Sequence, residues 1–196
     1  MRQATTGTLA VTGDEAADRL INSDPLALLL GMLLDQQIPL EWAFMGPLRL
    51  SERLGATLDA HDISERDPDA FADLVRTKPA LHRFPSSMAK RMQSLCRHLA
   101  DHYDGDAAAV WAGADTGSEL FERLRDLPGY GDEKARILIA VLAKRFDVRP
   151  EGWETQAGAF ADSQPRSVAD IDSPEALQRV RAWKREQKAR GKGKDE

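Results

Sequence analysis

The chain has 196 residues, of which 42% are hydrophobic and 30% charged, and its net charge at pH 7 is -5. A chain of this length buries a core in one domain or two small lobes without a disulfide or a metal. Its longest hydrophobic run, residues 26–34, is well short of the roughly 20 residues that a membrane span needs. We therefore expect no membrane span, and the absence of a secretory h-region predicts a cytoplasmic location.

Cysteine content and charge distribution narrow the cofactors and partners. Cys96 is the single cysteine, which excludes an internal disulfide, a zinc finger and a four-cysteine iron–sulfur cluster. The negative net charge argues mildly against nucleic acid. Residues 179–196, however, carry eight Lys or Arg against three acids, a local charge of +5. Two interpretations of this basic tail stay open, a segment that tracks phosphates and a solvated helix end.

Pro and Gly divide the chain into short helical segments, and only residues 6–12 have strand character, so the predicted fold class is all-α. Asp24 followed by Pro25 is typical of an N-cap with Pro at the first helical position. The helix that follows is apolar on nearly every side over residues 26–34 and should be central. It ends in the polar triplet 35–37. A second helix is predicted over residues 40–54, because Gly55 stops it.

Further helices follow the same signals. Asp67-Pro68 starts a third helix that ends near Arg76, and apolar residues recur at helical spacing from Met88 to Tyr103. Residues 118–125 and 132–146 form a helical pair around a short turn. A loop over residues 150–172 then leads to a last helix, which Ser173-Pro174 caps and which runs into the basic tail.

The turn between the paired helices reads Leu127-Pro-Gly-Tyr-Gly131. Its two glycines let the backbone turn sharply and approach a partner closely, and Asp132 is expected to cap the next helix. Backbone N–H groups at such a turn and helix N-terminus suit a phosphate oxygen. An ordinary helix connection is the alternative, but the apolar face that follows, Ala135 to Val141, favours the phosphate contact.

The stretch 127–135 resembles the hairpin of endonuclease III and the adenine glycosylases, members of the helix-hairpin-helix DNA glycosylases. Two further stretches, 33–37 and 88–99, match this family in the same order, so that the resemblance spans about residues 25–151. The whole chain also resembles a small bacterial branch of the family that lacks the iron–sulfur cluster; residues 33–44 and 181–184 support this.

The resemblance implies a two-lobed helical fold. One lobe is expected over residues 36–142, carrying the helix-hairpin-helix of residues 118–146. The second lobe combines residues 1–35 with 143–196 and includes the basic tail.

The resemblance also implies base excision repair: a monomer that binds double-stranded DNA in the nucleoid, flips a damaged or mispaired base and hydrolyses its N-glycosidic bond. Because flipping costs a few kcal/mol, side chains must fill the vacated stack. Gln37, together with Gln36, is the candidate plug, and helix capping is the alternative role. Phe84 is the candidate wedge, with a plain core residue as the alternative.

The hairpin is the third predicted DNA contact. The resemblance assigns it to Gly129, Tyr130, Gly131 and Lys134. No metal is expected in the site, and no cofactor beyond a monovalent cation that the hairpin carbonyls could hold.

The resemblance places the catalytic carboxylate at Glu151, where the family carries an Asp. A carboxylate about 4 Å from the oxocarbenium-like sugar is worth roughly 4 kcal/mol at an effective dielectric of 20. Glu adds a methylene, which shifts the charge by about an ångström, and misplacement on that scale costs ~100-fold. Asp147 and Glu154 are the other acids of this loop, and a solvated acid without a role is the alternative for Glu151.

Bifunctional members use a Lys whose matching position is Glu133. Lys134 is one residue later and therefore rotated by ~100° on the helix, so the sequence favours a monofunctional enzyme. Two other functions stay open. One is a non-catalytic DNA-binding protein of the same fold, and the other is a helical interaction protein unrelated to DNA.

Overall fold

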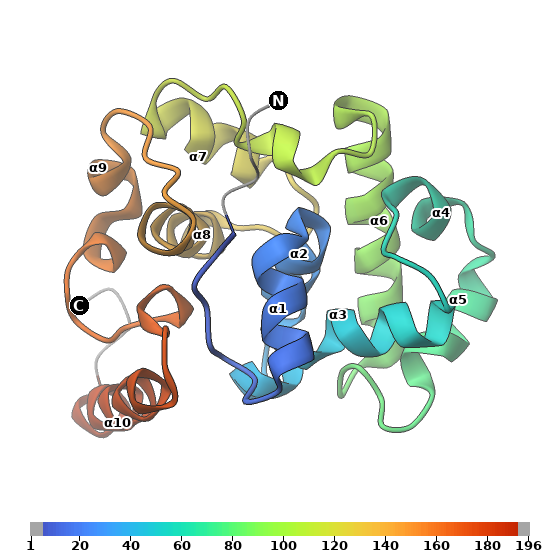
Figure 1. Ribbon diagram of the computed structural model, residues 1–196, viewed down its shortest axis with the longest axis horizontal. Coiled ribbons are helices and arrows are strands. Elements are labelled where there is room, and N and C mark those ends of the chain that lie inside the picture. The colour runs from blue at the N-terminus through green and yellow to red at the C-terminus, as the bar shows by residue number, and fades with distance from the viewer. Residues whose placement is uncertain (1–5, 192–196) are drawn as a thin grey trace.

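The computed structural model describes residues 6–191, and this part of the chain forms ten α-helices and no strand. The all-α fold class is therefore confirmed. Helix α2 (Pro25–Leu34) is the centre of the molecule, because every residue from Leu26 to Leu34 is buried. Figure 1 shows α2 between two groups of helices, with α4 to α6 on one side and α7 to α10 on the other.

In its described residues, the first half of the chain contains α2 and five further helices. Helices α4 and α5 pack on the long helix α6, while α1 and α2 both pack on α3. These elements are α1 (Glu15–Ser23), α3 (Leu40–Leu54), α4 (Ala60–Glu65), α5 (Pro68–Arg76) and α6 (Pro85–Tyr103).

The second half contains the hairpin pair and the C-terminal helices. Helix α8 packs on α7, on α9 and on the short 3-10 helix η3. These elements are η1 (Ala107–Val110), α7 (Gly117–Arg125), α8 (Asp132–Arg145), α9 (Trp153–Ala157), η2 (Gly158–Ala161), η3 (Val168–Asp170) and α10 (Pro174–Arg190). The division into two lobes at residues 35 and 142 stays a prediction.

Local capping chemistry sets several helix starts where the sequence predicts them. The Asp24 carboxylate accepts from the N–H groups of Leu26 and Ala27 at 2.8 and 3.2 Å. Ser173 accepts from Ala176 N–H at the start of α10 in the same way. Helix α3 ends at Gly55, whose φ of 66° is left-handed. These boundaries need only neighbouring residues, which is why the sequence shows them.

Other parts of the chain differ from the prediction. Residues 6–12 form no strand, because no neighbouring strand among the described residues accepts their N–H groups. Those of Thr8 and Ala10 donate to the carbonyls of Arg145 and Ile171 at helix ends, and the others that bond donate to Asn22 and Asp18. Helices α1 and α4 are additional, and the predicted loop 150–172 contains α9, η2 and η3. The prediction that Asp132 caps α8 is wrong: Gly131 is the N-cap, and the Asp132 carboxylate pairs with Arg125 at 2.8 Å.

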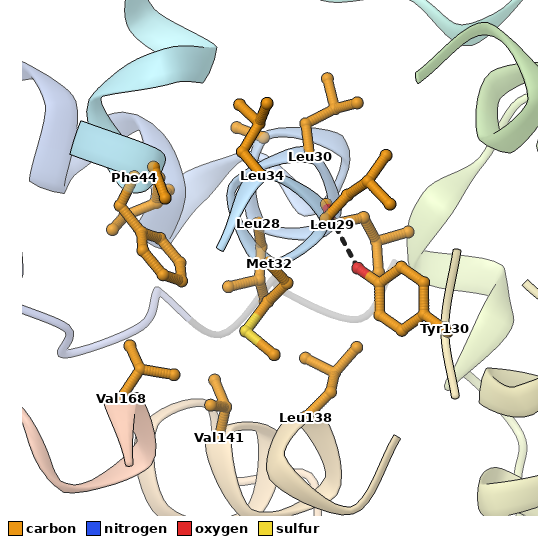
Figure 2. Close-up of a cluster of buried hydrophobic side chains, with 14 of the residues drawn as sticks. Leu28, Leu29, Leu30, Met32, Leu34, Phe44, Tyr130, Leu138, Val141 and Val168 are labelled. Carbon is orange, nitrogen blue, oxygen red and sulfur yellow. Dashed lines mark hydrogen bonds between the residues drawn. The ribbon is translucent and has the colours of Figure 1, made fainter. Parts of the chain in front are cut away.

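The core joins α2 to its neighbours on all sides. Figure 2 shows Met32 of α2 facing Leu138 and Val141 of α8. Phe44 of α3 packs so closely on α2 that a Cβ at Gly31 would lie 2.8 Å from its ring. Cys96 is fully buried, and burial raises the pKa of its thiol to about 12, so it is a core residue as expected.

Within residues 6–191 no helix is both long and apolar enough to span a bilayer. The same residues contain no cluster of three side chains that could ligate a metal ion.

Candidate functional site

The two hairpin positions Gly129 and Gly131 hold glycine for different structural reasons. Gly129 has φ of +87°, and a Cβ there would lie 2.4 Å from Cδ1 of Leu33. Its conformation and its packing on α2 therefore both require glycine. Gly131 has φ of -96°, which any residue adopts, and a Cβ there would meet no atom within 4 Å. Gly131 thus leaves open space at the N-terminus of α8, where no side chain caps the helix.

The hairpin side chains anchor it to α2. The Tyr130 ring is buried, and its hydroxyl donates to the Leu29 carbonyl at 2.7 Å (Figure 2). Burial raises the pKa of Tyr130 well above its ordinary value. The Lys134 amine donates to the carbonyls of Met32 and Asp35 at the C-terminal end of α2. Of the predicted hairpin contacts, Tyr130 therefore supports the turn, because its main-chain N–H also donates within the turn, to the Leu127 carbonyl at 3.0 Å.

The end of α2 leads into the glutamine turn, which we define as residues 35–39. The Gln36 side chain bonds to the protein on both sides: its amide donates to the Leu33 carbonyl at 2.8 Å, and its Oε1 accepts from Arg91 at 2.6 Å. Gln37 is exposed and has φ of 57°, a left-handed conformation that is uncommon for a non-glycine residue. Gln37 is thus presented to solvent, while Gln36 supports the turn.

Phe84 lies at the N-terminal end of α6. It is 46% exposed, and no other large hydrophobic side chain of the described residues is classed as exposed. The guanidinium of Arg83 lies 4.9 Å from the centre of its ring. The alternative of a plain core Phe is therefore wrong, and the exposed ring has the form that a wedge requires.

The loop that carries Phe84, which we call the wedge loop (residues 77–84), is fixed to α3. Trp42 donates its indole N–H to the Ala80 carbonyl at 2.9 Å. Arg53 donates to the carbonyls of Leu74 and Pro79. Since α3 begins directly after the glutamine turn, the same helix supports both exposed side chains.

His82 links the two segments directly. It is 1% exposed, its Nε2 lies 2.7 Å from the Gln36 carbonyl, and its Nδ1 accepts from Phe84 N–H at 3.0 Å. His82 and Arg91 are not predicted from the sequence. The position of His82 two residues before Phe84 is visible there, but its bond to the Gln36 carbonyl joins residues 46 positions apart in the chain.

Glu151 lies in a different contact network. Its main chain pairs with the segment before α7: Glu151 N–H donates to Asp115 at 3.0 Å, and Gly117 N–H donates to the Glu151 carbonyl at 2.7 Å. Its side chain is exposed, and none of the hydrogen bonds or ion pairs found in residues 6–191 involves its carboxylate. The backbone of Glu151 is therefore fixed, while its carboxylate is accessible to solvent.

Helix α10 contacts the start of α3. Arg181 pairs with Glu41 in the first turn of α3. Arg185 and Lys188 are exposed and follow Arg181 at i+4 and i+7, which places the three on one face of the helix. The described part of the basic tail is thus an ordered helix with an exposed basic face. Residues 192–196 of the tail lie outside the described residues.

A family model for the HhH-GPD superfamily of base excision DNA repair proteins matches residues 30–193. The chain belongs to this superfamily. The match covers the glutamine turn, the hairpin and Glu151. The predicted family is therefore confirmed, and the alternative of a helical interaction protein unrelated to DNA is wrong. A comparison with curated proteins finds no match.

In HhH-GPD proteins the hairpin is the expected phosphate contact, and the geometry here fits it. The N-terminus of α8 lies open above Gly131, while Gly129, Tyr130 and Lys134 fix the turn from below. A monovalent cation at the hairpin carbonyls stays a prediction. Main-chain oxygens are the ligand type that hard cations accept, and the Leu127 carbonyl already accepts from Tyr130 N–H at 3.0 Å.

Proposed function

We propose that this HhH-GPD protein is a monofunctional DNA glycosylase that flips a damaged or mispaired base from duplex DNA and hydrolyses its N-glycosidic bond. The observation that carries the proposal is the pair of exposed side chains, Gln37 and Phe84, held on one support beside the hairpin. A side chain that replaces an extruded base must be exposed in the free protein and rigidly supported, because an unsupported one would lose rotamer entropy on insertion.

Two positively charged side chains lie beside this pair and fit a DNA backbone. Arg83 lies over the Phe84 ring, and Arg91 bonds to the Gln36 side chain directly before Gln37. Together with the uncapped N-terminus of α8 they offer phosphate contacts around the insertion point. The acidic net charge of the chain therefore does not argue against a local DNA-binding surface.

Glu151 is the proposed catalytic carboxylate. As the sugar loses its base, positive charge develops at C1′ and the ring oxygen, and a carboxylate nearby stabilises it while accepting a proton from the attacking water. The water oxygen bonds to C1′ and gives a proton to Glu151, the base leaves with the electron pair of the N-glycosidic bond, and the departing base takes up a proton from solvent. The exposed Glu151 side chain on a fixed backbone fits a group that acts only once DNA covers it.

The position of Lys134 supports the monofunctional assignment. A lyase mechanism needs an unprotonated amine that attacks C1′ of the sugar. The Lys134 amine is instead held at the end of α2, where it donates to the Met32 and Asp35 carbonyls. We therefore expect base release to leave an intact abasic strand.

The test is incubation of the protein with duplexes carrying uracil, alkylated or oxidised bases. The expected product is an alkali-labile abasic site, with no strand scission before alkali is added. Glu151→Gln should abolish base release and preserve duplex binding, while Glu154→Gln, a matched change at an exposed residue of the adjacent helix α9, should leave release unchanged. The catalytic assignment is wrong if a broad lesion panel gives no release or if the Glu151→Gln variant is fully active.

A non-catalytic DNA-binding protein is the second candidate, and the Glu at position 151 favours it, since a longer side chain alters the reacting geometry. This function predicts salt-dependent duplex binding and base unstacking with no release from any lesion. Glu151→Asp separates the two candidates, because it restores the family residue. If Glu151→Asp releases a base and the wild-type protein does not, the natural protein retains the fold and the site but has lost glycosylase activity.

A further inference from the structure

His82 makes the only direct hydrogen-bonded link that the described residues show between the glutamine turn and the wedge loop. A backbone N–H can only donate, so Nδ1, which accepts from Phe84, carries no proton. Nε2 must then carry the proton and donate it to the Gln36 carbonyl. The buried ring is therefore held as one neutral tautomer that joins a residue directly before Gln37 to Phe84 itself.

The other side-chain hydrogen bonds that the described residues show for the wedge loop and the glutamine turn join each segment to a helix and not to the other segment. The wedge loop is fixed to α3 by Trp42 and Arg53 at its Ala80 and Pro79 carbonyls, which lie before His82 in the chain. The Gln36 side chain is fixed to α6 by Arg91. Each of these contacts holds one segment, whereas the His82 ring spans both.

Charge near the ring opposes its protonation. Burial lowers the pKa of His82, the Gln36 carbonyl opposes that shift, and the positive charges of Arg83 and Arg91 lower the pKa further. A proton on Nδ1 would face the Phe84 N–H and break that bond. The neutral form is thus the one in which the two segments are joined.

We infer that His82 is a positioning residue that couples Gln37 and Phe84, so that plug and wedge enter the duplex as one rigid unit. The inference rests on the proposed function, because it concerns how the flipped base is replaced. It gives a buried histidine, which touches no DNA, a specific part in base flipping. Coupling of this kind makes insertion cooperative: neither side chain reaches its place in the stack without the other.

A double-mutant cycle tests this coupling. The substrate is a duplex with a tetrahydrofuran abasic analogue next to 2-aminopurine, whose fluorescence rises on unstacking, so neither the lesion identity nor base release matters. In the wild-type background Gln37→Ala and Phe84→Ala should each reduce unstacking about 10-fold, and the double variant little further. In the His82→Phe background, which keeps an aromatic ring and removes both hydrogen bonds, the two effects should become additive.

Two conservative variants separate coupling from folding. His82→Asn keeps an acceptor near the Nδ1 position for Phe84 N–H and loses the reach to Gln36, while His82→Gln places an amide near the Nε2 position and loses the Phe84 acceptor. Both should give unstacking well below wild type, while each lowers Tm by the cost of one lost buried hydrogen bond, stays folded at the assay temperature and binds the duplex within about 3-fold. In both, the effects of Gln37→Ala and Phe84→Ala should be additive, whereas a purely structural role would leave them coupled in any variant that is folded.

The outcomes distinguish this inference from the proposed function. Additive effects of Gln37→Ala and Phe84→Ala in the wild-type background, or coupling that persists with His82→Phe, overturn the role of His82. Unstacking without base release from any lesion overturns only the catalytic proposal. If the wild-type protein binds the duplex and causes no unstacking, both the inference and the base-flipping function are wrong.

Discussion

The insertion edge, formed by Gln37 and Phe84, and the Glu151 loop are organised differently. At the edge, exposed side chains stand on buried polar contacts, including a histidine that is 1% exposed. At the loop, two main-chain hydrogen bonds fix the backbone, and the carboxylate lies exposed in solvent. Under the proposed function, the free protein is therefore preorganised to distort DNA, whereas the Glu151 carboxylate acquires its environment only when DNA covers it.

The largest expected effect separates the two regions. Glu151→Gln should reduce base release by about 100-fold or more, because it removes the charge that stabilises the transition state. The 2-aminopurine unstacking signal should stay at the wild-type level, since the insertion edge does not depend on Glu151. Single-turnover release and unstacking on the same duplex measure both. Loss of unstacking in this variant would contradict the independence of the two regions.

The hairpin glycines provide a second comparison, between a residue that supports the turn, Gly129, and one that leaves room for a phosphate, Gly131. Gly129→Ala should lower the free energy of unfolding by about 1–2 kcal/mol through its left-handed backbone, and further because its Cβ overlaps Leu33. Gly131→Ala, with ordinary φ and open space, should leave stability unchanged and weaken duplex binding.

Urea unfolding and fluorescence anisotropy measure the two quantities for each glycine variant. Equal effects of both substitutions on stability would show that Gly131 is also structural, and the phosphate contact at the hairpin would lose its support.

Lys134 should matter for stability and not for strand cleavage. Lys134→Met removes hydrogen bonds to the last carbonyls of α2 and should cost about 1–2 kcal/mol in urea unfolding. Lys90→Met, an exposed change on α6, is the control and should cost a few tenths at most. Borohydride should trap no covalent DNA adduct with the wild-type protein. A trapped adduct that Lys134→Met abolishes would make the enzyme bifunctional.

The sequence predicts those features that depend on near neighbours. The starts of α2, α5 and α10 follow from a capping residue before Pro, and the hairpin from its glycines. It does not predict His82, whose role depends on the Gln36 carbonyl, 46 residues away. It also misassigns Asp132, because whether that carboxylate caps α8 or pairs with Arg125 depends on how α7 and α8 pack.

Acid should weaken the insertion edge more than the loop. The pKa of His82 is below its ordinary value of 6.5, mainly because of burial, so the unfolded chain binds a proton that the folded protein rejects. This contribution to stability is complete above about pH 6.5 and is lost as the pH falls through the folded pKa. Between about pH 7 and 5 the free energy of unfolding should therefore fall more steeply with decreasing pH for wild type than for His82→Gln.

Burial also lowers the pKa of His98, so the difference between wild type and His82→Gln is the quantity that isolates His82. Identical pH dependences in the two proteins would contradict the buried neutral tautomer.

The smallest expected effect concerns the exposed basic face of α10, which Arg181 and Glu41 join to the start of α3. Arg185→Gln and Lys188→Gln should each lower the slope of log affinity against log salt by ~0.9, if each side chain contacts one phosphate. Arg19→Gln on α1, where the arginine pairs with Glu15, is the control and should leave the slope unchanged. Because base release depends on Glu151 and unstacking on the edge, neither should change in the α10 variants under saturating DNA. A slope that stays constant would mean that α10 stabilises α3 through Arg181 and Glu41 and has no part in binding DNA.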